Sequence, residues 1–182
     1  MQCEPISRVE LALTPTPLQH LQRLSRHTGV EFWMKRDDLT GDMGLGGNKV
    51  RKLEYLLGAA VAAGATHVLT TGGPQSNHAR ATAAAAARLG LQCVLVLAGQ
   101  DPGTRDGNLL LDQLFGAEIR FPGAITPADQ ARGLEAAAAE IAAAGGRPYV
   151  IPVGGSTPLG CLGSYRCYAE LAAALPGDAW VC

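Results

Sequence analysis

Residues 67–90 read HVLTTGGPQSNHARATAAAAARLG. His67 to Thr71 is a short apolar run, which is typical of a buried strand. A polar turn follows, and then an alanine-rich run from Ser76 to Leu89 that ends at Gly90. Alanine is the strongest helix former, and a glycine commonly ends a helix. The stretch therefore predicts a strand, a turn and a helix in succession, which is the repeating unit of an α/β fold.

The same alternation continues on both sides of this unit. Thr16 and Pro17 have the pattern of a helix start, with a cap followed by proline at the first helical position. Strands are predicted at Val30–Met34, His67–Thr71, Cys93–Ala98, Glu118–Phe121 and Tyr149–Ile151, and helices at Leu18–His27, Asn48–Ala63, Ser76–Leu89, Asn108–Phe115, Ala128–Ala144 and Leu162–Leu175. Five or six such units predict a parallel sheet with helices on both faces. A last apolar run, Ala179 to Cys182, predicts the opening of a further buried strand.

The composition indicates a globular protein that acts on small molecules. Of the 182 residues, 47% are hydrophobic and 17% are charged, which is enough apolar material for a substantial core. Fifteen basic and 16 acidic side chains nearly balance, so neither a nucleic-acid surface nor a polybasic membrane patch is indicated. No apolar run approaches the roughly 18 residues of a membrane span, and a cytoplasmic location is expected. The five cysteines include no Cys-x-x-Cys pair, which argues against a disulfide framework and against a metal site.

A lysine stands at the start of the second predicted helix, in the sequence Gly46-Gly47-Asn48-Lys49. A lysine amine fixed at a glycine turn is well placed to bind a cofactor aldehyde. Lys52 falls on the same helix face three residues later and is a candidate for binding a phosphate, whereas Arg51 is turned away toward solvent or a carboxylate. For this turn alone, an ordinary helix start with solvated basic residues is the alternative.

A second polar turn, Gln75-Ser76-Asn77-His78, opens the next helix. Its serine and asparagine are ordinary capping residues, but a hydroxyl can also move a proton and an amide can hold an aromatic oxygen. His78 is a candidate substrate ligand, although a histidine in the first turn of a helix is more often structural. Both turns, and the stretch Pro152 to Thr157, follow strands of the predicted sheet, where α/β folds bind ligands.

These motifs together resemble one family, the pyridoxal-phosphate enzymes of the D-cysteine desulfhydrase and 1-aminocyclopropane-1-carboxylate deaminase group, in the tryptophan-synthase-β-like superfamily. The resemblance covers the whole chain. It is carried by Pro15-Thr16-Pro17-Leu18, by Lys35-Arg36-Asp37-Asp38-Leu39-Thr40-Gly41, by the two turns, by Gly107-Asn108-Leu109-Leu110-Leu111-Asp112, and by Pro148 to Ser156 with Leu159-Gly160. It implies the type II fold of pyridoxal-phosphate enzymes.

The resemblance also implies roles for individual residues. Lys49 corresponds to the Schiff-base lysine, Lys52 to a phosphate ligand and Asn77 to the partner of the cofactor's ring oxygen. Ser76 corresponds to the hydroxyl that assists proton transfer or holds the substrate carboxylate, and Asn77 and His78 lie beside it as further substrate ligands. The implied reaction is β-elimination on a small amino acid, with D-cysteine giving pyruvate, sulfide and ammonia. Deamination of 1-aminocyclopropane-1-carboxylate or another sulfur-lyase reaction is the alternative, and the histidine after Asn77 favours the desulfhydrase branch.

The same resemblance predicts how the chain is organised. Residues 1–48 correspond to the N-terminal part of a large domain, residues 49–158 to a small α/β domain and residues 159–182 to the start of the returning large domain. Family members continue with a glycine-rich phosphate loop, so we expect a truncated chain with an incomplete large domain. A homodimer is implied. An inactive fragment or an interaction module is the alternative of a different class, whereas a generic nucleotide-binding domain is disfavoured because neither glycine-rich nucleotide motif is present.

Overall fold

The computed structural model describes residues 6–41, 44–123 and 126–175. Its centre is a four-stranded parallel sheet of β3 (His67–Gly72), β4 (Gln92–Leu97), β5 (Glu118–Arg120) and β6 (Pro148–Val150). The strands run in the order β5-β4-β3-β6, and β3 pairs along its whole length with β4. The α/β fold is therefore confirmed, with four parallel strands in the described ranges in place of the five or six predicted.

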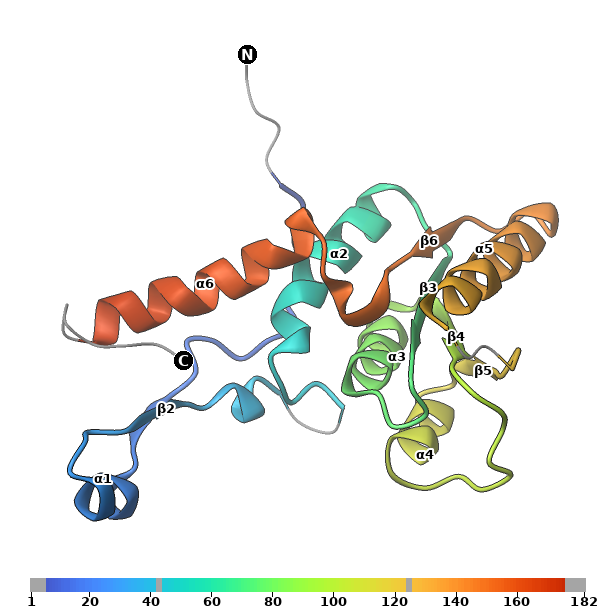
Figure 1. Ribbon diagram of the computed structural model, residues 1–182. Helices are drawn as coiled ribbons and strands as arrows, with labels where there is room; N and C mark the ends of the chain where they lie inside the picture. The colour runs from blue at the N-terminus through green and yellow to red at the C-terminus, as the bar shows by residue number, and fades with distance from the viewer. Residues whose placement is uncertain (1–5, 42–43, 124–125, 176–182) are drawn as a thin grey trace.

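Helices cover both faces of this sheet (Figure 1). On one face lie α2 (Lys49–Ala62), α3 (Asn77–Leu89) and α4 (Gly107–Leu114), and on the other lies α5 (Pro127–Ala143). Successive strand residues point to opposite faces. Leu95 and Leu97 accordingly pack with the first group of helices, whereas Val94 and Val96 pack with α5.

The alanine-rich helix α3 lies tightly against the sheet, as the sequence predicted. Most of its alanines are buried, and they belong to the same core cluster as Val68 and Leu95 of the strands. Because an alanine side chain is short, the helix backbone comes close to the sheet without leaving voids. This helix brings Asn77, its first residue, to the carboxyl end of β3.

The N-terminal region differs from the prediction. Leu18–His20 forms β1, which pairs antiparallel with β2 (Trp33–Lys35), and α1 covers only Gln22–Thr28. The predicted helix from Leu18 is therefore wrong in its first residues, and the predicted strand Val30–Met34 begins later and lies outside the parallel sheet. As a strand, the segment Leu18–His20 pairs its backbone with β2. A helix of so few residues would leave most of its first N–H groups without a partner. The side chain of Thr16, the predicted helix cap, instead donates to Asp37 Oδ1 at 2.8 Å.

The C-terminal helix α6 (Pro158–Ala174) packs across α2. It begins four residues before the predicted position because Thr157 caps it, accepting the N–H of Gly160 at 3.0 Å. Gly163 allows the close crossing, since a Cβ there would collide with the carbonyl oxygen of Arg51. Two short 3-10 helices, η1 (Asp37–Leu39) and η2 (Val153–Gly155), complete the described elements. The strand predicted at Ala179–Cys182 lies outside the described residues.

Two kinds of feature can be checked over the described ranges. No helix there combines the length and the hydrophobicity that crossing a bilayer requires. In the same ranges, no group of three His, Cys, Asp or Glu side chains is placed to hold a metal ion.

Candidate functional site

Lys49 is the first residue of α2, as predicted. Its Nζ donates to Asn48 Oδ1 at 3.1 Å, and the side chain is half-buried. The preceding Gly47 has φ of 119°, a backbone conformation that favours glycine. Its N–H donates to the buried Thr40 hydroxyl at 2.9 Å. The glycine turn therefore holds the Lys49 backbone in a fixed position while leaving the amine out of any ion pair within the described residues.

Lys52 lies one turn further along α2 and reaches the loop that follows β6. Its Nζ donates to the carbonyl oxygen of Gly154 at 3.3 Å and to Ser156 Oγ at 3.1 Å. The loop can approach so closely because Gly154 has a φ of 68° and Gly155 has a φ of 60°. A cation beside a glycine-rich turn is a suitable partner for an anion. The prediction that these segments share one edge of the sheet is thus confirmed.

Ser76 is the N-cap of α3. Its Oγ accepts the N–H of Ala79 at 3.2 Å, so the capping interpretation holds. A hydroxyl that accepts one hydrogen bond still has a hydrogen to donate. The turn is tight, since a Cβ on Gly72 would lie 2.5 Å from Ser76 Oγ. This position is compatible with a catalytic role for Ser76, and that role stays a prediction.

Asn77 follows directly and is exposed. Its Oδ1 accepts a hydrogen bond from Asn108 Nδ2 at 3.0 Å. Its own amide nitrogen makes no hydrogen bond within the described residues, and it is therefore free to donate to an acceptor. This is the chemistry that the predicted contact with a ring oxygen requires.

His78 lies beneath the other site residues. His78 is only 3% exposed, and its Nε2 lies 2.9 Å from Thr70 Oγ1. Because the Thr70 hydroxyl donates to the carbonyl oxygen of Ile151, it accepts from His78, which places the imidazole hydrogen on Nε2. Burial, together with the charges of Lys49 and Lys52, lowers the His78 pKa to about 4. This geometry favours the structural role of His78 over direct contact with a substrate.

Arg51 is a residue whose importance the sequence did not reveal. It is 3% exposed and does not meet solvent, but binds carboxylates on both sides. It donates to Asp37 through Nε and Nη2, both at 2.9 Å, and to Glu170 through Nη1 at 2.8 Å. The carboxylate half of the prediction is confirmed and the solvent half is wrong. The run of charged residues at 35–38, a lysine, an arginine and two aspartates, was the feature of the sequence that could have indicated a partner for Arg51.

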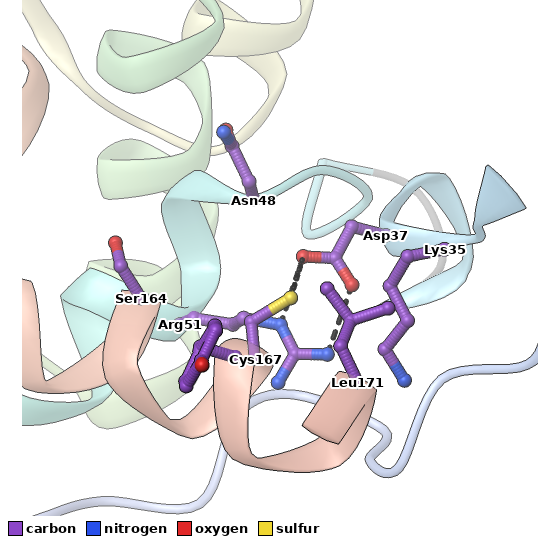
Figure 2. Close-up of a pocket in the computed structure, with 8 residues that line it drawn as sticks. Lys35, Asp37, Asn48, Arg51, Ser164, Cys167 and Leu171 are labelled. Atoms are coloured by element: carbon purple, nitrogen blue, oxygen red, sulfur yellow. Dashed lines mark hydrogen bonds and ion pairs between the residues drawn. The ribbon is translucent and has the colours of Figure 1, made fainter. Parts of the chain in front are cut away.

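Arg51 and Asp37 border a pocket of about 380 Å³ (Figure 2). Its lining residues come from the segment before α2, from α2 and from α6: Lys35, Asp37, Asn48, Arg51, Ser164, Cys167, Tyr168 and Leu171. Burial opposes ionisation of Glu170, yet hydrogen bonds from Arg51 and Lys35 lower its pKa to about 2. The Cys167 thiol lies 3.6 Å from Asp37 Oδ2, and burial raises its pKa. The charge cluster fixes α2, and with it the start of the helix at Lys49.

The comparison with family models agrees with this site. A model described as pyridoxal-phosphate dependent enzyme matches residues 9–182. The chain belongs to this family. Membership implies pyridoxal 5'-phosphate as the cofactor, and the residues present fit it. The cofactor aldehyde needs an amine, and Lys49 places one at a fixed helix start. Lys52 and Asn77 place a cation and an amide donor at the same sheet edge, and these are groups that would suit a phosphate and a ring oxygen.

Individual members of the pyridoxal-phosphate dependent family are similar over nearly the whole chain. A Pyrococcus horikoshii protein that carries the provisional name 1-aminocyclopropane-1-carboxylate deaminase is 47% identical over 165 residues, which is 91% of this chain and 50% of that protein. A Klebsiella pneumoniae D-cysteine desulfhydrase is 48% identical over 171 residues, covering 91% of this chain and 51% of the relative. The chain therefore spans about half the length of these relatives.

A solved structure shows the same architecture. The crystal structure of an ACC deaminase homologue superposes with a TM-score of 0.86 at 45% identity, and the match covers 97% of this chain and 52% of that one. The type II fold predicted from the family resemblance is thus confirmed for the described part of the chain. Because both activities are named among the similar proteins, the comparisons establish the family and leave the substrate open.

Proposed function

We propose that this chain contributes the lysine side of the active site in a pyridoxal-phosphate-dependent lyase that eliminates sulfide from D-cysteine. The observation that carries the proposal is the placement of Lys49 and Lys52 one helical turn apart, at the sheet edge where Ser76 and Asn77 begin α3. An amine, a second cation, a hydroxyl and an amide donor are the groups that this chemistry needs.

The proposed roles follow from what each side chain can do. Bound pyridoxal phosphate withdraws electrons from the α-carbon of an amino acid. Lys52 holds the phosphate and Asn77 donates to the ring oxygen. The Lys49 amine takes the α-proton, since the described residues do not engage it in an ion pair. The Ser76 hydroxyl orients the substrate carboxylate or passes a proton. Sulfide then leaves from the β-carbon, and addition of water to the remaining three-carbon unit yields pyruvate and ammonia.

Deamination of 1-aminocyclopropane-1-carboxylate is the second candidate, because similar proteins carry that name. This substrate has no α-hydrogen, so a proton would have to be taken from another carbon, with Lys49 or Ser76 as the base. His78, whose presence favoured the desulfhydrase branch in the sequence, is buried, and its Nε2 lies 2.9 Å from Thr70 Oγ1. The division into residues 1–48, 49–158 and 159–182, the homodimer and the cytoplasmic location remain parts of this proposal.

Reductive trapping tests the cofactor assignment. The chain is incubated with pyridoxal phosphate and reduced with borohydride, and the modified peptide is identified by mass. The lysines of the chain are Lys35, Lys49 and Lys52, so assignment is direct. We expect one adduct, at Lys49, that is absent in Lys49→Ala. Lys35 is an internal control, because its Nζ is paired with Glu170 at 2.6 Å. Labelling spread evenly over the three would contradict the proposal and favour the inactive fragment or interaction module.

Product analysis then separates the two reactions. With D-cysteine, the proposed activity releases sulfide and ammonia in equal amounts, whereas deamination of the cyclopropane substrate releases ammonia without sulfide. Ser76→Ala serves as the matched variant, because it should lower turnover while leaving the Lys49 adduct in place. Ammonia from the cyclopropane substrate with no sulfide from D-cysteine would establish the second candidate.

A further inference from the structure

Asn108, the second residue of α4, donates three hydrogen bonds to the turn that begins α3. Its main-chain N–H donates to Gln75 Oε1 at 2.8 Å. Its side-chain nitrogen donates to the carbonyl oxygen of Gln75 at 2.8 Å and to Asn77 Oδ1 at 3.0 Å. Nothing in the roles assigned so far uses this residue.

Two neighbours determine which way round the Asn108 amide lies: the carbonyl oxygen of Gln75, which can only accept, and Arg80, which can only donate. Arg80 Nη1 lies 3.5 Å from Asn108 Oδ1 and donates to it. The amide oxygen thus faces a cation while the amide nitrogen faces two oxygens. The reverse orientation would place the NH2 group against the guanidinium and the oxygen against the two acceptors, and it would lose every one of these hydrogen bonds.

The orientation passes on to Asn77. Because Asn108 offers it a donor, Asn77 must present its own Oδ1 there, which leaves its NH2 group as the free end. Arg80 also connects this arrangement to the lysine turn, since its Nη2 donates to the carbonyl oxygen of Gly46 at 2.9 Å. One guanidinium therefore connects the lysine turn to Asn108, which is itself bonded to Asn77.

We propose that Asn108 is a positioning residue that, held by Arg80, fixes the amide of Asn77 as a hydrogen-bond donor for the ring oxygen of the cofactor. The inference rests on the proposed function for the identity of the acceptor, but the orientation of the amides is a property of the chain alone. The ring oxygen of pyridoxal phosphate is electron-rich, so an amide NH2 stabilises it and an amide oxygen repels it.

The decisive variant is Asn108→Asp, which keeps the shape and exchanges the donor for an acceptor. Asn77 then has to turn its NH2 group toward residue 108 and its oxygen toward the cofactor. We expect the Kd for pyridoxal phosphate, titrated through the absorbance of the Lys49 adduct, to rise by about ten- to a hundredfold, the range for a lost charge-assisted hydrogen bond. Gln113→Glu is the matched control, because it makes the same change at an exposed position of α4 and should alter Kd less than about twofold.

Asn108→Ala keeps the proposal testable if the aspartate variant fails to fold. It frees Asn77 without reversing it, and the expected rise in Kd is about three- to tenfold. Equal Kd values for Asn108→Asp and Gln113→Glu would overturn the proposal, as would an unchanged Kd for Asn108→Ala.

A measurement without cofactor separates this proposal from the proposed function. In the 15N-labelled chain, the side-chain NH2 protons of Asn108 should exchange with water at least several-fold more slowly than those of Asn77. Arg80→Ala should narrow the difference, because it removes the donor that holds the amide oxygen. Arg88→Ala, exposed near the end of the same helix, should leave the difference unchanged. Slower exchange at Asn77 than at Asn108 would overturn the orientation. Failure of Lys49 to trap the cofactor with the expected exchange intact would overturn only the proposed function.

Discussion

Arg51 and Glu170 lie 119 residues apart in the sequence and form a two-point ion pair, with Nη1 to Oε1 at 2.8 Å and Nη2 to Oε2 at 3.0 Å. The pair joins α2 to α6. Arg51 also donates to Asp37 at 2.9 Å, the contact that Figure 2 shows. Burial alone would lower the pKa of the guanidinium, but the hydrogen bonds that it donates to Glu170 and Asp37 raise it. The start of α2, and thus Lys49, is held by an ion cluster that includes Glu170, a residue outside the motifs quoted from the sequence.

Arg51→Ala should therefore destabilise the fold strongly. Removing one partner of a buried ion cluster leaves the remaining carboxylates without compensation, which costs about 3–5 kcal/mol. We expect a loss of that order in the free energy of unfolding, measured by urea denaturation. Arg105→Ala, which removes the exposed partner of Asp101, is the control and should hardly change the midpoint. Similar midpoints for both variants would show that the cluster does not stabilise the helix pair.

Lys52→Ala should weaken the binding of pyridoxal phosphate much more than that of pyridoxal, which lacks the phosphate. Among the residues that the structure describes, Lys52 bonds only to neutral oxygens of Gly154 and Ser156, so its charge is available to an anion. A charge-assisted bond contributes roughly 1.5–3 kcal/mol, or about ten- to a hundredfold in Kd. Equilibrium titration of both aldehydes against wild type and variant provides the measurement. An equal loss of affinity for the two aldehydes would mean that Lys52 acts by supporting the turn.

Local patterns predicted the parallel part of the fold well. The strand, turn and helix around residues 67–90 and the alanine-rich packing of α3 depend on burial and helix propensity, which are encoded in contiguous residues. Lys49, Lys52, Ser76 and Asn77 lie at or within one turn of a helix start, so their positions could be predicted from the sequence, whereas their roles stay predictions.

Features that depend on distant partners were not predicted. Leu18–His20 has helical spacing, but the pairing with β2 makes it a strand. In the sequence, Arg51 has the pattern of an ordinary helix-surface residue. Only the fold brings Asp37 and Glu170 into contact with it. Asp112 is similar. Burial raises the pKa of this carboxyl to about 7, although the charge of Arg80 opposes the change, and nothing in its neighbours along the chain indicates that it is buried.

His78 should make the stability of the fold depend on pH in the acid range. Its pKa in the folded chain is about 4, whereas the unfolded side chain titrates near 6.5, because burial and the charges of Lys49 and Lys52 disfavour the imidazolium. As pH falls below 6.5, the unfolded chain binds a proton that the folded chain excludes until about pH 4. Stability contributed by the neutral ring is therefore present above pH 6.5 and is lost between pH 6.5 and 4, by up to about 3 kcal/mol.

The contribution of His78 is isolated by difference, since carboxylates titrate in the same range. Urea denaturation from pH 7.5 to 4 compares wild type with His78→Gln, whose amide can still donate to Thr70 but cannot be protonated. We expect the wild-type free energy of unfolding to fall more steeply, by up to one extra proton's slope of about 1.4 kcal/mol per pH unit. His27→Gln, at an exposed position, should retain the wild-type slope. Parallel curves for wild type and His78→Gln would mean that the ring is open to solvent and able to meet a substrate.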